Sequence, residues 1–372
     1  MSENIQDHPL FVFLRSTLAQ QCTPLEVVSL LDMDELLEFA AKQAIKGIVY
    51  EGLKLNRQAY PEVIQRKEVL KWAGLTEKGR RLFAIAQRRV EDLSRIFAEA
   101  GFSSCILKGQ GLSLIYPVHE SRTPGDIDIW VKGSREDITA FVRSKCPDVF
   151  EQYHHIDFPI FKDMVVEVHY LPAQMASPIN NSRLQAYYRQ QQEEQFTNRC
   201  QVLGEHVCIP TKTFNAIFLL SHMMRHFFNE GVGLRQLVDY YYLLNQGFTA
   251  AEKTDFATTV KHLGMEKFAG AVMWIEMNVL GIDRDHLLIP PLEKTGRLLF
   301  EEILGTGNFG YLDKRYTFRE KGILACALTD VYRDFLLAKM FPSEALWKPY
   351  AKLVNQQWKI KDLFRNRVRT DR

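Results

Sequence analysis

A short apolar run in the middle of the chain carries two aspartates one residue apart. It reads GDIDIWV, from residue 125 to residue 131. In a β-strand, residues i and i+2 point to the same face, so Asp126 and Asp128 would lie side by side while Ile127 and Ile129 face the other way. Adjacent carboxylates repel, and burial raises this cost unless a cation or donor compensates it. The pattern favours a divalent metal site, with an exposed turn and strand edge as the alternative.

The composition is that of an ordinary globular protein. The chain has 372 residues, of which 46% are hydrophobic and 25% charged, enough for two or three domains. A formal net charge of +2 does not favour nucleic acid as a partner. The six cysteines include no C-x-x-C pair, which is typical of reduced thiols. Without a recognisable signal peptide or an apolar stretch of about 20 residues, we expect a cytoplasmic protein with no membrane partner.

Apolar periodicity divides the chain into three regions. Residues 1–79 and 209–372 carry apolar residues at helical spacing, whereas residues 80–208 alternate short strand-like runs with helical segments. A long amphipathic helix is expected over residues 76–100, with Gly101 as its stop. We therefore predict an α+β protein, in which a mixed sheet with helices is flanked by N- and C-terminal helical regions.

Two more pieces of the central region complete a candidate site. Gly109 and Gly111 follow the strand-like run CILK, where glycine lets backbone amides approach a phosphate at a helix N-terminus. Lys108 adds a positive charge, although ordinary turn chemistry is the alternative. Glu167 stands between valines in VVEVHY, either at an exposed edge or aimed at the site. Three carboxylates on neighbouring strands can hold two metal ions, and Mg²⁺ suits oxygen ligands.

In order and spacing, these pieces resemble the nucleotidyltransferase superfamily of the DNA polymerase β type. The matching segments are residues 107–111, 126–128 and 166–168. The longer pattern, LKGQGLSLIYP followed by RTPGDIDIWV and VVEVHY, is similar to a large bacterial nucleotidyltransferase family that is mostly uncharacterised. The resemblance covers roughly residues 80–245. The chain departs from the superfamily at Gln110, where Ser or Gly ordinarily follows the glycine.

The resemblance implies a polymerase β-like fold and transfer of a nucleoside monophosphate from a triphosphate to a hydroxyl or similar group of a small-molecule or protein acceptor, releasing pyrophosphate. It implies two Mg²⁺ ions with the bound triphosphate, Mn²⁺ as the alternative ion, and ATP as the first expected nucleotide. The alternative is a catalytically silent nucleotide- or partner-binding protein. The implied residues are Asp126, Asp128 and Glu167 for catalysis and metal binding; Lys108, Gly109, Gln110, Gly111 and Arg122 for the nucleotide; and His169, His222, His226, Arg235 and Asp239 as residues lining the cleft.

Histidines offer further, weaker signals. His222 and His226 have the i, i+4 spacing of metal ligands but no obvious third ligand, so helix packing or substrate contact is favoured over zinc. His154, His155 and His169 either flank the metals or occupy polar strand positions.

Four further expectations follow from the same patterns. Arg235 and Asp239, also four apart, would form an ion pair. Both flanking helical regions would build the acceptor side of a cleft. Repulsion between the aspartates predicts that Asp128→Asn leaves metal-free stability unchanged or slightly higher. The basic stretch over residues 348–372 either attracts RNA or an acidic partner or forms a solvated end.

Overall fold

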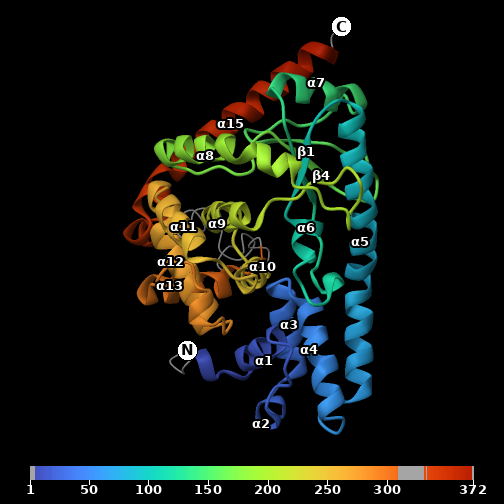
Figure 1. The fold of residues 1–372 in the computed structure, drawn as a ribbon, viewed down its shortest axis with the longest axis vertical. Coiled ribbons are helices and arrows are strands. Elements are labelled where there is room, and N and C mark those ends of the chain that lie inside the picture. The colour runs from blue at the N-terminus through green and yellow to red at the C-terminus, as the bar shows by residue number, and fades with distance from the viewer. Residues whose placement is uncertain (1–4, 309–330, 332, 371–372) are drawn as a thin grey trace.

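A four-stranded mixed sheet lies within a mostly helical structure (Figure 1). The computed structural model describes residues 5–308, 331 and 333–370, with side chains described as far as Trp358. Its longer elements are α1 (Pro9–Leu18), α2 (Leu25–Val28), α3 (Met33–Lys42), α4 (Lys46–Ala59), α5 (Arg66–Glu99), β1 (Ser104–Leu107), α6 (Gly109–Ser113), β2 (Ile127–Val131), α7 (Arg135–Lys145), β3 (His155–Asp157), β4 (Val166–His169), α8 (Pro178–Thr197), α9 (Lys212–Asn229), α10 (Leu234–Asn245), α11 (Ala250–His262), α12 (Glu266–Asn278), α13 (Glu293–Thr306) and α15 (Pro342–Thr370).

The sheet has the strand order β1-β2-β4-β3. β2 and β4 are parallel, while β1 and β3 pair antiparallel with β2 and β4 respectively. In this register Asp128 lies opposite Glu167, and His155 lies opposite His169. The predicted mixed sheet is therefore confirmed, and its pairing sets the residues of three strands beside one another.

One face of the sheet is closed by helices α5 and α7. Ile127 and Ile129 of β2 belong to a buried cluster with Val90 and Phe97 of α5 and Val142 of α7. Because alternate residues of a strand face opposite sides, Asp128 and Trp130 point to the other face. The two isoleucines thus anchor the strand, and the aspartate is left for the opposite side, as the sequence predicted.

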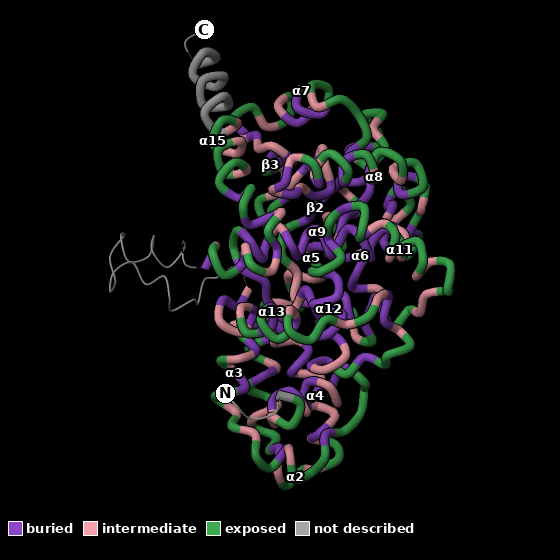
Figure 2. Tube along the Cα trace, turned by 90° about the vertical axis from the view of Figure 1, so that its left-hand side faces the viewer, coloured by how far each residue is buried: buried purple, intermediate pink, exposed green. Residues whose placement is uncertain are grey.

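The opposite face meets helices α8 and α9. The ring of Trp130 lies 4.6 Å from that of Phe196 in α8 and 5.8 Å from that of Phe214 in α9, measured between centroids. The residues of α9 from Phe214 to Phe228 are almost all buried, and Figure 2 places this helix near the middle of the long axis of the molecule. Polar side chains of α9 are consequently held in the interior, facing the sheet.

The N-terminal helices support the rest of the molecule from one end. Helix α5 begins at Arg66 rather than near residue 76, and it spans the boundary predicted between residues 79 and 80. Helices α1–α4 lie beside its N-terminal half (Figure 1). Gly47 of α4 packs on the backbone of Ser121 so closely that an added Cβ would lie 2.2 Å from the Ser121 carbonyl oxygen. Helix α4 therefore braces the loop that leads into β2.

Other local expectations have mixed outcomes. Gly101, with φ +82°, follows the end of α5 as predicted, and β3 and β4 form an antiparallel pair joined by eight residues. Helix α8 was not predicted. The basic C-terminal stretch is helical in α15, but most of its side chains lie outside the described residues. Among the described residues, no helix has both the length and the apolar character that a bilayer crossing requires.

Candidate active site

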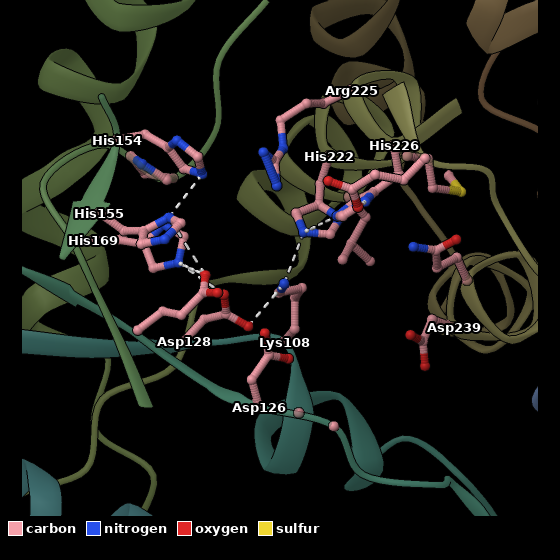
Figure 3. A pocket seen from close by; sticks show the side chains of 18 of the residues that line it. Lys108, Asp126, Asp128, His154, His155, His169, His222, Arg225, His226 and Asp239 are labelled. Atoms are coloured by element: carbon pink, nitrogen blue, oxygen red, sulfur yellow. Dashed lines mark hydrogen bonds and ion pairs between the residues drawn. The ribbon is translucent and has the colours of Figure 1, made fainter. Parts of the chain in front are cut away.

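A cleft lies between the polar face of the sheet and helices α9 and α10 (Figure 3). Its walls come from the turn after β1, the start of β2, strands β3 and β4, and the two helices. Most of the residues predicted for the site line it: Lys108, Gly109, Arg122, Asp126, Asp128, Glu167, His169, His222, His226, Arg235 and Asp239.

Three carboxylates converge at the floor of the cleft. One oxygen each of Asp126, Asp128 and Glu167 lie within 4.8 Å of one another. Asp126 immediately precedes β2 and is exposed, whereas Asp128 is only 3% exposed. Oxygen atoms at this spacing fit a divalent cation. The charge of Asp128 raises the pKa of Asp126 above its ordinary value, and although the residue as a whole is exposed, partial desolvation of its carboxylate at the floor of the cleft acts in the same direction, as expected for like charges held together.

Two cations of the protein compensate the buried charge of Asp128. Lys108 Nζ lies 2.8 Å from Oδ2, and His169 Nε2 lies 2.8 Å from Oδ1. Burial disfavours the carboxylate, but Lys108 and His169 hold the pKa of Asp128 well below its usual value. Burial likewise opposes charge on His169, yet the hydrogen bonds to Asp128 and Glu167 raise its pKa to about 9. Asp128 is therefore ionised in the fold, and its attraction to two cations outweighs its repulsion from Asp126.

Histidines from β3 and β4 form a cluster beside Glu167. His155 Nδ1 and His169 Nε2 lie 3.5 Å and 3.4 Å from Glu167 Oε2. His154 Nε2 lies 3.0 Å from His155 Nδ1. His155 and His169 thus occupy polar strand positions beside Glu167, and the alternative in which these histidines flank the metals stays a prediction.

A second chain of contacts runs along helix α9. Lys108 Nζ lies 2.7 Å from His222 Nε2, which is 3.2 Å from His226 Nε2. His226 Nδ1 lies 2.7 Å from Glu230 Oε2. Burial lowers the pKa of His226 to about 4 despite this carboxylate, so the imidazole is neutral near pH 7. The i, i+4 histidine pair thus contacts the lysine of the glycine turn.

Asp239 has a different partner from the one that helical spacing predicted. Its two oxygens accept hydrogen bonds from Arg122 Nε and Nη2 at 2.7 Å and 2.8 Å, and Tyr116 donates a third at 2.6 Å. Arg235 instead donates to the carbonyl oxygen of Thr123 at 3.2 Å. The expected Arg235–Asp239 ion pair is therefore wrong, because a bidentate guanidinium from a distant loop occupies the carboxylate. The Arg122–Asp239 pair fixes the loop before β2 to α10.

The glycine turn has unusual backbone geometry. Lys108 has φ +57° and Gly109 has φ +49°, both in the region that favours glycine. A Cβ added at Gly109 would meet no atom within 4 Å, so this residue faces the open cleft. Gln110 and Gly111 do not line the cleft: the Gln110 side chain is buried and donates to the Phe83 carbonyl, and Gly111 packs under Ile209. Gln110, where the chain departs from the superfamily, thus packs behind the turn and does not contact the cleft.

The two flanking regions contribute unequally. The C-terminal region supplies a wall of the cleft through α9 and α10, as expected. None of the described residues before residue 80 lines it, so the expectation for the N-terminal region is wrong. These helices instead support a wall of the cleft from outside it. The Gln43 side chain accepts a hydrogen bond from Leu234 N at 3.0 Å, at the start of α10.

Sequence reasoning missed two charged residues of the cleft, Arg225 and Glu230. In Figure 3 the guanidinium of Arg225 projects into the space between His154 and His222. Among the described residues, no carboxylate forms an ion pair with Arg225. The sequence held one indication that Arg225 faces the cleft. It follows His222 by three residues, which places both side chains on one face of a helix.

An acidic cluster on a mixed sheet, faced by cationic side chains across a cleft, defines a candidate transferase of phosphorus-containing groups. The chain belongs to a family described as uncharacterised nucleotidyltransferase, whose model matches residues 29–281. The predicted resemblance is thereby confirmed, and the match extends beyond residues 80–245 at both ends. No curated protein and no solved structure matches the chain. Membership supports an enzyme of the nucleotidyltransferase class.

Proposed function

We propose that this protein transfers a nucleoside monophosphate from a nucleoside triphosphate to a hydroxyl or similar group of a small-molecule or protein acceptor, and releases pyrophosphate. The observation that carries the proposal is the convergence of Asp126, Asp128 and Glu167 within 4.8 Å in a chain of the nucleotidyltransferase family. We further propose a polymerase β-like catalytic region over residues 80–208, faced by helices of the region over residues 209–372.

The carboxylates would hold Mg²⁺, with Mn²⁺ as the alternative ion. Asp126, Asp128 and Glu167 offer oxygen atoms only, which is the ligand type that Mg²⁺ prefers. When bound, such ions would offset the negative charge of the triphosphate and the charge that develops during transfer. The exposed position of Asp126 leaves this side of the cluster accessible to a triphosphate, for which ATP is the first candidate.

The remaining charged residues of the cleft suit the triphosphate and its acceptor. Gly109 presents its backbone to open space, and Lys108 and Arg225 bring positive charge to the same cleft. Arg122 binds Asp239 through Nε and Nη2, so its main role would be to position the loop that carries Asp126. Glu167, partly open to the cleft, would accept the proton of the acceptor hydroxyl.

The direct test is nucleotide binding and turnover by the purified chain. ATP, GTP, CTP and UTP are titrated with and without Mg²⁺, and pyrophosphate release is measured with a panel of hydroxyl-bearing small molecules and proteins. We expect Mg²⁺-dependent binding of at least one nucleotide that is lost in the Asp126→Asn/Asp128→Asn variant. Equal affinity in both proteins, or no Mg²⁺-dependent binding, would overturn the proposal.

The same experiment separates the alternative of a silent binding protein. That alternative predicts carboxylate-dependent binding of Mg²⁺–nucleotide without pyrophosphate release for any acceptor. It was suggested by Gln110 in the glycine motif, but this side chain is buried behind the turn and does not reach the cleft. The enzyme is therefore the function that the cleft supports best.

A further inference from the structure

We propose a second cation site in this cleft, formed by His155, Glu167 and His169, that takes a nitrogen-binding divalent transition ion of the Zn²⁺ or Mn²⁺ type. It deepens the proposed function and rests on it, because Glu167 would be shared with the oxygen-only site of Asp126 and Asp128.

The sheet itself assembles the ligand set. His155 of β3 lies opposite His169 of β4 in the antiparallel register, and Glu167 precedes His169 by two residues on the same strand. Residues that are paired across strands or two apart along a strand share a face. One ligand atom from each of the three lies within 4.8 Å of the other two. The cluster therefore depends on rigid backbone pairing.

The spacing of the ligand atoms matches a coordination shell. Glu167 Oε2 lies 3.5 Å from His155 Nδ1 and 3.4 Å from His169 Nε2. Hydrogen bonds of these groups are ordinarily about 2.7–3.2 Å long. Two ligands bound tetrahedrally at about 2.1 Å from one ion are separated by about 3.4 Å. The two measured separations are therefore close to the distance between two ligands of one ion.

The inward nitrogens also contact other side chains: His169 Nε2 lies 2.8 Å from Asp128 Oδ1 and His155 Nδ1 lies 3.0 Å from His154 Nε2, so a bound ion would replace these two hydrogen bonds. His169 Nδ1 lies 3.2 Å from the carbonyl oxygen of Leu171, so Nδ1 carries a proton and Nε2 faces Glu167. His155 Nδ1 faces Glu167, and its Nε2 lies 3.7 Å from the carboxylate of Asp157, beyond hydrogen-bond distance. The outer contact of His169 with Leu171 is of the kind that orients metal-binding histidines in known sites.

The chemistry of the set separates it from the site of Asp126 and Asp128. Two imidazole nitrogens with one carboxylate suit Zn²⁺, Mn²⁺ and related ions, whereas Mg²⁺ prefers oxygen ligands alone. His155 and His169 are each 3% exposed, and Glu167 is partly open to the cleft. A buried set with one open side would retain its ion without nucleotide and leave a position for the acceptor oxygen.

Metal titration of the full chain tests the site without relying on activity. Protein stripped with a chelator is titrated with Zn²⁺ by calorimetry in the presence of excess Mg²⁺. We expect one tightly bound Zn²⁺ in the wild type and at least about tenfold weaker binding in His155→Ala. His262→Ala, an exposed histidine at the end of α11, is the matched control and should bind as the wild type does.

Two further variants locate the ion and separate this proposal from the proposed function. Asp126→Asn should retain Zn²⁺ but lose Mg²⁺–ATP binding, whereas His155→Ala should retain Mg²⁺–ATP binding, which also shows that it folds. Zn²⁺ binding that survives in His155→Ala but is lost in His222→Ala would place the ion at the α9 histidines and overturn the proposal. Absence of tight Zn²⁺ binding in the wild type would also overturn it, while leaving the nucleotide experiment unaffected. Unchanged Mg²⁺–nucleotide binding in Asp126→Asn would instead count against the proposed function alone.

Discussion

Asp128 of β2 and Glu167 of β4 lie directly opposite each other in a parallel strand pair. Residues in this relationship share a face of the sheet, so backbone pairing alone brings the two carboxylates together. Asp126 joins them from the residue just before β2. The candidate metal site is therefore built mainly on two strands, and a single parallel register aligns it.

Removing either aspartate charge should abolish transfer. Asp126→Asn and Asp128→Asn each remove one unit of charge with little change in shape, so the site would lose several kcal/mol of transition-state stabilisation, or on the order of 10³-fold in rate. Pyrophosphate release measures the effect. Asp163→Asn, which changes an exposed carboxylate paired with Arg89, is the control and should remain active. Full activity in either cleft variant would mean that its carboxylate does not serve the chemistry.

The same two substitutions should have opposite effects on metal-free stability. Asp128→Asn weakens contacts to Lys108 and His169 and should cost about 1–3 kcal/mol, which corrects the expectation of unchanged or higher stability drawn from repulsion alone. Asp126→Asn removes a like charge and should leave the free energy of unfolding equal or higher. Urea unfolding with a chelator present measures both. A common sign for the two changes would contradict this account.

Gly109 and Gly101 offer a matched test of the turn. Both have positive φ, and an added Cβ would meet no atom within 4 Å at either position. Each Gly→Ala change should therefore destabilise by about 1 kcal/mol through backbone strain. Only Gly109→Ala should raise KM for the nucleotide, because this glycine faces the cleft. If both variants have the same KM for the nucleotide, the turn at Gly109 does not contribute to phosphate binding.

Breaking the buried Arg122–Asp239 pair should be costly. Both side chains are almost fully buried and joined by two hydrogen bonds, so Asp239→Ala leaves an uncompensated guanidinium and should destabilise by about 3–5 kcal/mol. Glu77→Ala, which removes an exposed ion pair with Arg81, should cost less than about 1 kcal/mol. Denaturant unfolding measures the free energy of unfolding of both variants. A similar loss in both would show that the buried pair stabilises the protein no more than the exposed pair does.

Glu276 should make stability depend on pH. It is fully buried in α12, and no described residue hydrogen-bonds its carboxylate oxygens; burial raises its pKa well above the ordinary value. The folded protein therefore binds this proton more tightly than the unfolded chain, and wild-type stability falls as pH rises above about 4.5, by up to about 1.4 kcal/mol per pH unit. In Glu276→Gln this loss is absent, so the free energy of unfolding of the variant should rise relative to that of the wild type as the pH increases. Urea unfolding from pH 4 to pH 8 measures this difference, and Glu293→Gln, which changes an exposed side chain of α13, should follow the wild type.

Much of the local structure was predictable because it depends on short-range patterns. Alternation in GDIDIWV indicated which side of β2 carries the aspartates. The Ser134 hydroxyl caps α7 by accepting from Asp137 N, a local contact of the kind that the sequence Ser-x-x-Asp favours. Helix α8 was missed because its apolar residues do not form one amphipathic face. The pairing of Asp239 was also mispredicted: spacing along the helix named Arg235, while the actual partner, Arg122, comes from a loop more than a hundred residues away.

The sequence by itself determined the chemistry of the carboxylates, since three acidic residues within apolar strands must meet a cation, a proton or solvent. It also determined the family, through the order and spacing of its motifs. Only the tertiary structure decided which cations compensate Asp128 and which helices line the cleft. It also decided that the N-terminal helices contact α10 without lining the cleft themselves. The physical reason is range: strand periodicity acts over a few residues, whereas Lys108, His169 and Arg225 reach the cleft through packing between segments that are distant in the sequence.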